Sequence, residues 1–319
     1  LSTVYPMGWQ NSPCGYCHQK ESTNRWYTAH ASQLSARDYQ DLVNHNWRRS
    51  GHLLYRRDML RSCCPTFTIR LNTHLFRPSR TNRKTVNKVN RYLRCPPEAA
   101  PGDVPLTKPQ RSTVLPQSLP PRRQRTADPN NMYMRKYVDF GDCVMDGSNQ
   151  ESNPDILQRL TVVTQPAKFE EEAYDVFLRY QKSVHSDDVG KWNKDTYTNF
   201  LCQSPIHDAD YAKITAYGSY HQKYYLNSTL IAVGVIDILP LSVSSVYLFY
   251  EPKFAFLGLG RYCAVREAIF AKRLQAAHPH LLRELNYYNM GYYIHSCPKM
   301  NYKGDYRPSE LLDPVTYEW

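Results

Sequence analysis

The chain has 319 residues, 41% of them hydrophobic and 22% charged, which is the composition of a soluble globular protein with room for two domains. Its longest apolar run, Leu230–Pro240, is too short to span a bilayer, and its start lacks the basic-then-apolar pattern of a secretory signal. We therefore expect no membrane segment and a cytoplasmic protein, with the nucleus as a second location. Lys and Arg outnumber Asp and Glu by 40 to 29, and this formal charge of +11 favours a polyanionic partner.

Residues 1–76 form a cysteine-rich N-terminal zone that we interpret as a metal-binding module. Cys14 and Cys17 make a CxxC pair, and the adjacent Cys63 and Cys64 follow after an interval of 45 residues. Four thiolates suit zinc or an iron–sulfur cluster, and their spacing does not separate the two. A histidine could replace one of the adjacent cysteines, and redox chemistry of the CxxC is the rival interpretation. The candidate histidines are His18, His52 and His74.

Residues 77–130 are basic and then proline-rich. From residue 77 to residue 94 there are seven basic residues and no acidic one. Val86, Val89 and Leu93 recur at helical spacing, which predicts an amphipathic helix. Its basic side chains would face nucleic-acid phosphates, although a solvated face is the alternative. They are Arg80, Lys84, Lys88 and Arg91. Residues 96–130 have the composition of a linker or loop.

Residues 131–319 alternate between strand-like and helix-like patterns, as in an α/β domain. A helical face recurs through Phe169–Tyr180, and a second helix is predicted to begin at Gly258. The predicted strands cover residues 213–226, 229–240, 244–250 and 290–295. This order of antiparallel strands, glycine turn, helix and return strand matches an acetyltransferase-like (GNAT-type) architecture.

The turn at Gly258 and Gly260 precedes a helix, so its backbone N–H groups could hold a phosphate, although a plain tight turn fits equally well. The coenzyme A-binding version of this turn carries an Arg or Gln before a glycine-richer loop. This sequence has neither. We therefore expect no coenzyme A.

The chain resembles the eukaryotic arginyl-tRNA–protein transferases in nine ordered motifs. They are SPCGYC (12–17), WRRSG (47–51), CCPTFTIR (63–70), YGSYHQ (217–222), IAVGVIDILP (231–240), SSVYL (244–248), YYIHSCPKM (292–300), YKG (302–304) and YRPS (306–309). The resemblance covers most of residues 10–95 and 160–319. It implies an aminoacyltransferase that moves arginine from arginyl-tRNA to proteins beginning with Asp, Glu or oxidised Cys, within the N-degron pathway. It also ties Cys14, Cys17, Cys63 and Cys64 to the zinc or iron–sulfur centre.

Such a reaction needs a group that takes a proton from the attacking amine. Asp237 is the chief candidate, because a carboxylate in an apolar strand requires an explanation. A structural ion pair is the alternative. His221 is a second candidate base, and the Tyr220 and Tyr250 hydroxyls could donate to the oxyanion or the ribose.

An acidic acceptor requires a cationic pocket, and the donor arginine requires a carboxylate. The cationic candidates are Arg48, Arg49, Lys299, Lys303 and Arg307. The carboxylate candidates are Glu251, Asp305 and Asp237. Two other classes of protein are the alternatives. An acetyl-coenzyme A acetyltransferase would need the missing phosphate loop, and an RNA-binding metal module would not explain the C-terminal zone.

Overall fold

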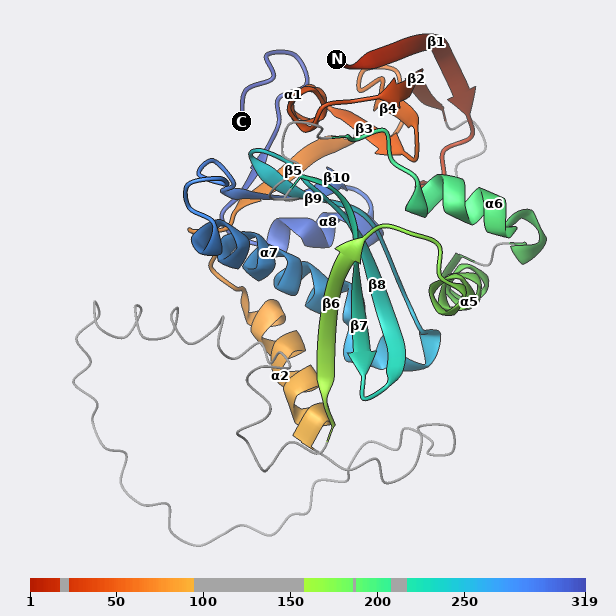
Figure 1. Ribbon diagram of the computed structural model, residues 1–319. Helices are drawn as coiled ribbons and strands as arrows, with labels where there is room; N and C mark the ends of the chain where they lie inside the picture. Colours follow the sequence, from red (N-terminus) through yellow and green to blue (C-terminus); the bar gives the residue numbers. More distant parts are fainter. Residues whose placement is uncertain (18–22, 95–157, 186–187, 208–216) are drawn as a thin grey trace, which may run out of the picture.

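Two β-sheets, packed one above the other, organise the computed structural model of this protein (Figure 1). The structure describes residues 1–17, 23–94, 158–185, 188–207 and 217–319. The predicted linker at residues 96–130 and His18 lie outside these ranges.

The smaller sheet is built from the N-terminal zone and is antiparallel throughout, in the order β1-β2-β4-β3. Its strands are β1 (Thr3–Ser12), β2 (Asn24–Gln33), β3 (Trp47–Ser50) and β4 (Leu53–Arg57). Helix α1 (Ala36–Asn44) begins after Ser35, whose side chain accepts a hydrogen bond from the backbone of Asp38. Tyr39 and Val43 of α1 are buried against this sheet's apolar residues.

The larger sheet has the order β11-β5-β10-β9-β8-β7-β6. Its strands are β5 (Phe67–Asn72), β6 (Leu160–Pro166), β7 (Gly218–Leu226), β8 (Thr229–Ile238), β9 (Ser242–Tyr250), β10 (Tyr287–Tyr293) and β11 (Ser309–Leu311). Only the β9–β10 pair is parallel, so the sheet is mixed and the α/β prediction is confirmed. The apolar run near residue 230 is β8, an interior strand of this sheet that is buried along almost its whole length.

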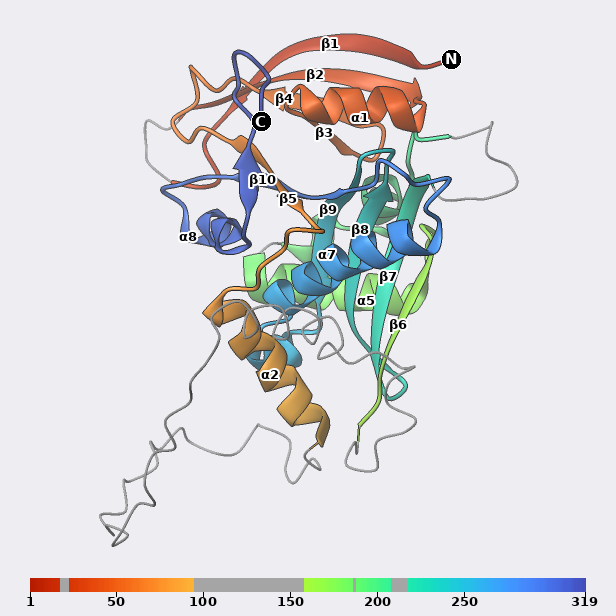
Figure 2. The ribbon, with the colours of Figure 1, turned by 90° about the vertical axis from the view of Figure 1, so that its left-hand side faces the viewer.

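Helices cover both faces of this larger sheet (Figures 1 and 2). Successive residues of β8 point to opposite faces, so Val233 packs with α5 whereas Ala232 packs with α7. Helix α2 lies against α7 and buries Val86, Val89 and Leu93, which confirms the predicted amphipathic helix. The helices are α2 (Arg80–Arg94), α5 (Glu171–Tyr180), α6 (Lys194–Tyr197), α7 (Leu259–Ala277) and α8 (Pro298–Asn301). Short segments of 3-10 or π-helix are Gln181–His185, Val189–Lys191, Thr198–Cys202, Pro252–Leu257 and Tyr302–Asp305.

The zones predicted from the sequence do not coincide with the two sheets of the structure. Strand β5 belongs to the predicted module 1–76, yet it pairs with β10 and β11 of the larger sheet. The return strand predicted at 290–295 is β10, displaced toward the N-terminus to 287–293. Of the strand predicted at 213–226, residues 213–216 lie outside the described ranges, and β7 begins at Gly218. Within the described ranges, none of the helices has the length and apolar character needed to cross a membrane.

Candidate active site

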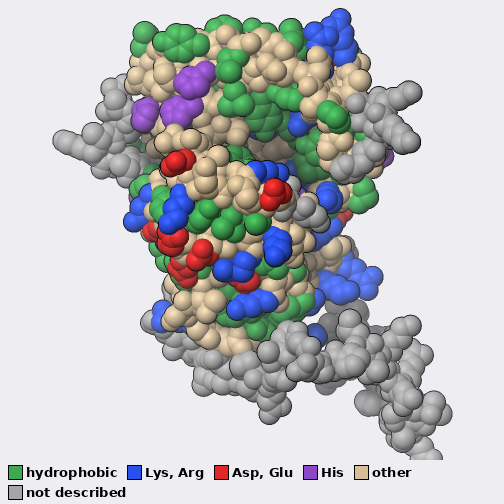
Figure 3. All heavy atoms as spheres, turned by 90° about the vertical axis from the view of Figure 1, so that its right-hand side faces the viewer, with side chains coloured by type: hydrophobic (Ala, Val, Ile, Leu, Met, Phe, Trp, Pro, Cys, Tyr) green, Lys and Arg blue, Asp and Glu red, His purple; other side chains and the backbone are tan. Residues whose placement is uncertain are grey.

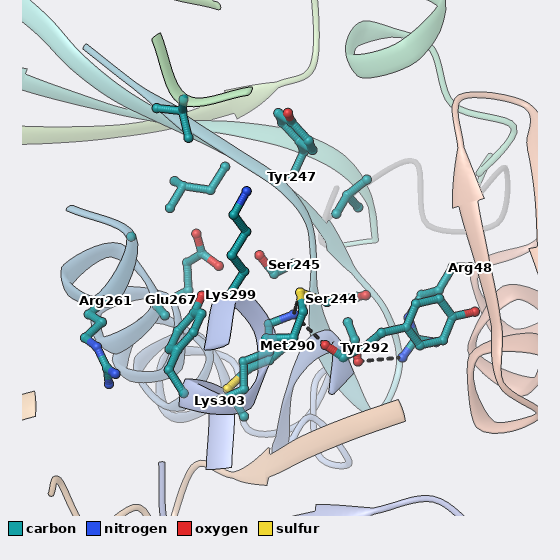
Figure 4. Close-up of a pocket in the computed structure, with 18 of the residues that line it drawn as sticks. Arg48, Ser244, Ser245, Tyr247, Arg261, Glu267, Met290, Tyr292, Lys299 and Lys303 are labelled. Carbon is teal, nitrogen blue, oxygen red and sulfur yellow. Dashed lines mark hydrogen bonds between the residues drawn. The ribbon is translucent and has the colours of Figure 1, made fainter. Parts of the chain in front are cut away.

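A cavity of about 810 Å³ lies where β9 and β10 separate. The two strands pair only from Ser242 to Ser244 of β9, and the β8–β9 register then shifts near Val246. Beyond this point both strands border the cavity instead of each other. The other walls are the loop between Cys14 and Cys17, strand β3, the start of α7 and residues 298–303. Residues from both ends of the chain therefore surround one space (Figure 4).

One wall carries Arg48, a buried cation that lacks an acidic partner among the described residues. Its side chain is 5% exposed, donates 3.1 Å to Thr68 Oγ1, and lies 5.2 Å from the centre of the Tyr292 ring. Its Nε–H has no hydrogen-bond partner. A buried guanidinium without a counter-ion is unfavourable unless an anion arrives, so this wall suits a negatively charged ligand.

The neighbouring Arg49 also reaches the cavity but is already neutralised. Its Nε and Nη2 atoms donate to the two carboxylate oxygens of Asp237 at 2.7 and 2.5 Å. Ser219 donates to the same carboxylate at 2.6 Å, and Asp237 is fully buried. Asp237 does not border the cavity. Of the two interpretations of Asp237, this geometry favours the structural ion pair over proton transfer.

Lys303 is the second unneutralised cation of the cavity wall. Its Nζ donates 2.7 Å to the carbonyl oxygen of Tyr292, and Figure 4 shows it beside that residue. Burial, helped by the charge of Arg48, lowers the pKa of Lys303 to about 7. Of the five predicted cations, Arg48 and Lys303 are thus unpaired in the cavity wall, and Arg49 is in the wall but paired with Asp237. Lys299 borders the cavity from an exposed position, and Arg307 is exposed and lies outside it.

The two other predicted catalytic side chains, His221 and Tyr220, are not in the cavity wall. His221 is fully buried, and its Nε2 lies 2.9 Å from the carbonyl oxygen of Leu201. Burial lowers the pKa of its imidazole. Tyr220 packs against the apolar core below α7. By contrast, Tyr250 borders the cavity, and burial raises the pKa of its hydroxyl, which keeps it a proton donor.

The four predicted metal ligands come together beside this cavity. The sulfur atoms of Cys14, Cys17, Cys63 and Cys64 all lie within 4.8 Å of one another, so the set fits a single metal centre. Burial opposes ionisation of Cys14, but backbone N–H groups donate to its sulfur and lower its pKa to about 7. His52 and His74 are not in the group.

This cysteine cluster is joined to the C-terminal part of the chain. Cys14 and Cys64 are buried against Ile294 and Cys297, which follow β10. The two residues inside the CxxC, Gly15 and Tyr16, border the cavity. A metal bound by the four cysteines would therefore also fix the part of the cavity wall that Gly15 and Tyr16 form.

The predicted tRNA-binding residues lie at the opposite side, around the start of α7. Gly258 has a φ of 71° and precedes α7, and both Gly258 and Gly260 border the cavity. Helix α2 runs beside them, with the Thr85 methyl group 3.6 Å from where a Cβ of Gly258 would lie. Four of its basic side chains are exposed: Arg80, Lys84, Lys88 and Arg91. The face of the molecule in Figure 3, in contrast, mixes acidic and basic side chains.

One acidic residue of the cavity escaped the sequence analysis. Glu267 borders the cavity from α7 and is 1% exposed. A signal was present, because Cys263, Glu267 and Ala271 recur every four residues on the buried side of that helix.

Comparisons with known proteins identify the family. A family profile described as "Arginine-tRNA-protein transferase, N terminus" matches residues 12–84, and one described as "Arginine-tRNA-protein transferase, C terminus" matches residues 172–313. The chain is 32% identical to "Arginyl-tRNA--protein transferase 1" of Drosophila melanogaster, with 100% of this chain and 82% of the relative covered. Identity to "Arginyl-tRNA--protein transferase 1" of Arabidopsis thaliana is 26%, with 100% and 72% covered.

A shorter match reaches a bacterial protein. The "Aspartate/glutamate leucyltransferase" of Pseudomonas fluorescens (strain Pf0-1) is 32% identical over 54% of this chain and 65% of its own length. These matches place the chain among the aminoacyltransferases. Within that class, the chain belongs to the arginine-tRNA-protein transferase family.

Proposed function

We propose that this enzyme transfers arginine from arginyl-tRNA to the N-terminal amine of proteins that begin with Asp, Glu or oxidised Cys, which marks them for the N-degron pathway. The amine nitrogen bonds to the ester carbonyl carbon, the ester C–O bond breaks, the amine loses a proton, and the 3′-terminal ribose hydroxyl of the tRNA is regenerated. Because the ester is already activated, no covalent enzyme intermediate is needed. The cytoplasm, with the nucleus as a second location, is the proposed compartment.

The observation that carries this proposal is the pair of unneutralised cations in the cavity wall. Arg48 and Lys303 are held by neutral groups, so an acidic acceptor side chain would supply their missing counter-charge. A neutral acceptor residue would leave them unpaired, and this cost would give the specificity. Lys299 would add charge at the exposed rim. Arg49 would act indirectly, because Asp237 already neutralises it.

For the donor, we propose that α2 and the start of α7 bind the tRNA near its charged end. Four exposed basic residues on α2 would contact phosphates, and backbone N–H groups near Gly258 and Gly260 would lie at the positive end of the α7 dipole. The Tyr250 hydroxyl could then donate to the oxyanion or the ribose. We propose an acetyltransferase-like fold for this half, which the separation of β9 from β10 supports. We also propose that it takes no coenzyme A, because the turn at Gly258 lacks the glycine-richer loop.

For the cysteines, we propose a structural metal centre. Their four sulfur atoms lie within 4.8 Å of one another and would hold one zinc ion or an iron–sulfur cluster. A bound metal would cross-link the CxxC pair to the adjacent pair of cysteines. Gly15 and Tyr16 would thereby be held at the cavity.

A transfer assay tests the proposed reaction. Purified protein is incubated with radiolabelled arginyl-tRNA and peptides that differ only in a first residue of Asp, Glu or Ala. We expect label on the acidic peptides alone, and Arg48→Gln should reduce it by about tenfold or more. Arg283→Gln, at an exposed position outside the site, is the matched control. Equal transfer to the Ala peptide, or none to any peptide with the metal bound, would contradict the proposal.

A further inference from the structure

Glu267 is a carboxylate without a counter-ion in the wall of the cavity. It is 1% exposed, and it is the one acidic side chain among the described residues that border this space. No Lys, Arg or His of the described residues forms an ion pair with it. Burying a carboxylate unpaired is costly, so its presence indicates a cationic partner that arrives from outside the chain.

The fold holds this carboxylate in one position. Its Oε2 accepts a hydrogen bond from the Tyr288 hydroxyl at 2.6 Å, and Ser245 of β9 also donates to it. Opposite its Oε1 lies Gly234 of β8, where an added Cβ would come within 2.6 Å. Gly234, which has no side chain, therefore leaves room in β8 for the carboxylate of Glu267. Burial raises the pKa of Glu267 to about 7.

The carboxylates expected from the sequence to bind the donor arginine are all paired within the protein. Glu251 lies 2.8 Å from Arg179. Asp305 lies 2.8 Å from Arg261. Asp237 is bound to Arg49. A guanidinium that entered the cavity would meet none of them unpaired.

We propose that Glu267 binds the guanidinium of the arginyl group on the donor tRNA and so selects arginine; this inference rests on the proposed transfer reaction. In the view of Figure 4, Glu267 and Arg48 lie on opposite sides of the cavity. The site then has an anionic end for the donor side chain and a cationic end for the acidic acceptor. A donor amino acid without positive charge leaves Glu267 buried and unpaired, which penalises its binding.

Binding of non-reactive donors tests this assignment. The probes are one tRNA carrying arginine or citrulline through a stable 3′-amide, and the same tRNA uncharged. Citrulline has nearly the shape of arginine but no charge. We expect the wild-type protein to prefer the arginyl probe by about tenfold or more. The Glu267→Gln variant should lose this preference and keep its affinity for uncharged tRNA, whereas Glu284→Gln, at an exposed position, should keep both.

Two results would overturn the assignment. One is a wild-type protein that binds the arginyl and citrullinyl probes equally, a measurement that does not depend on any variant folding. The other is a Glu267→Gln variant that keeps the preference and loses kcat together with a pH limb near 7, as for a general base. Binding is measured without transfer, so a wild-type protein that binds but modifies no peptide would refute the proposed reaction and leave this inference standing.

Discussion

Adjacent arginines have different surroundings in this protein because β3 turns successive side chains to opposite sides. Arg48 reaches Thr68 and the Tyr292 ring, whereas Arg49 enters a bidentate ion pair with Asp237. We therefore expect different roles for these two arginines. Arg48 is not neutralised and can bind an anionic ligand, whereas Arg49 stabilises the structure through its ion pair.

The first prediction concerns Asp237. Its replacement by Asn would leave Arg49 buried without a counter-charge, and we expect a loss of about 3–5 kcal/mol in the free energy of unfolding. Urea denaturation measures the change. Glu171→Gln is the matched control, because its ion pair with Lys194 is more than half exposed and should contribute less than about 1 kcal/mol. Unchanged stability combined with a large drop in kcat would instead support Asp237 as a base.

The second prediction is a pH dependence set by Lys303, whose pKa is lowered to about 7 in the free protein. Lys303 is charged below that pH and neutral above it. We therefore expect kcat/KM for an acidic peptide to fall as the pH rises through about 7. Lys303→Arg keeps its charge, so this fall should move to much higher pH. The exposed Lys272→Arg should keep the wild-type profile, and identical profiles for all three proteins would contradict the role of Lys303.

Among the elements, α2 has two chemically different faces. Its apolar face attaches it to α7, and its basic face is exposed. No acidic residue lies in its first turn, so the positive end of its dipole adds to the charge.

A charge-removal experiment tests the exposed face of α2. The triple variant Arg80→Gln, Lys84→Gln, Lys88→Gln should flatten the slope of log K for tRNA against log[salt] by about 2–3, because fewer counterions are released. The matched control replaces three lysines near α5, namely Lys168, Lys182 and Lys194, by Gln. Equal slopes for both variants would show that α2 does not contact phosphates.

The CxxC loop is a second element whose local structure determines the cavity. Cys14→Ser should reduce the amount of bound metal and lower Tm by about 4 °C or more, because the loop loses one of its metal ligands. Transfer should fall with it, because Gly15 and Tyr16 would no longer be fixed at the cavity. Metal analysis, thermal unfolding and the transfer assay are compared with Cys202→Ser, which lies outside the cluster. Full transfer by metal-free protein would exclude this coupling.

For the whole molecule, the two sheets are expected to unfold together. Strand β5 connects the N-terminal zone to the larger sheet, Leu239 packs among residues of the smaller sheet, and the Arg49–Asp237 pair crosses between them. Three of the five tryptophans, Trp9, Trp26 and Trp47, lie in the smaller sheet, so it dominates the fluorescence signal. Tryptophan fluorescence and circular dichroism should therefore give coincident urea transitions. Two separated transitions would show that residues 1–76 unfold independently.

The sequence alone determined the features that depend on local pattern. Helical spacing predicted α2, and the strand-like patterns of residues 213–226 and 229–240 predicted β7 and β8, because side-chain periodicity reflects the buried faces of an element. The compact cysteine group was predicted from the types and spacing of its residues, since four thiols need only be brought to one point.

Only the tertiary structure decided which charges remain available. Arg49 and Asp237 are 188 residues apart and look alike, in sequence, to many other charged residues. Because each neutralises the other, we expect neither to act directly in the reaction, and Arg48 and Lys303 are left as unneutralised cations. Glu267 became visible for the same reason, because a charge is identified as unpaired only when every neighbour in space is known. Pairing depends on long-range contacts, and no local periodicity encodes them.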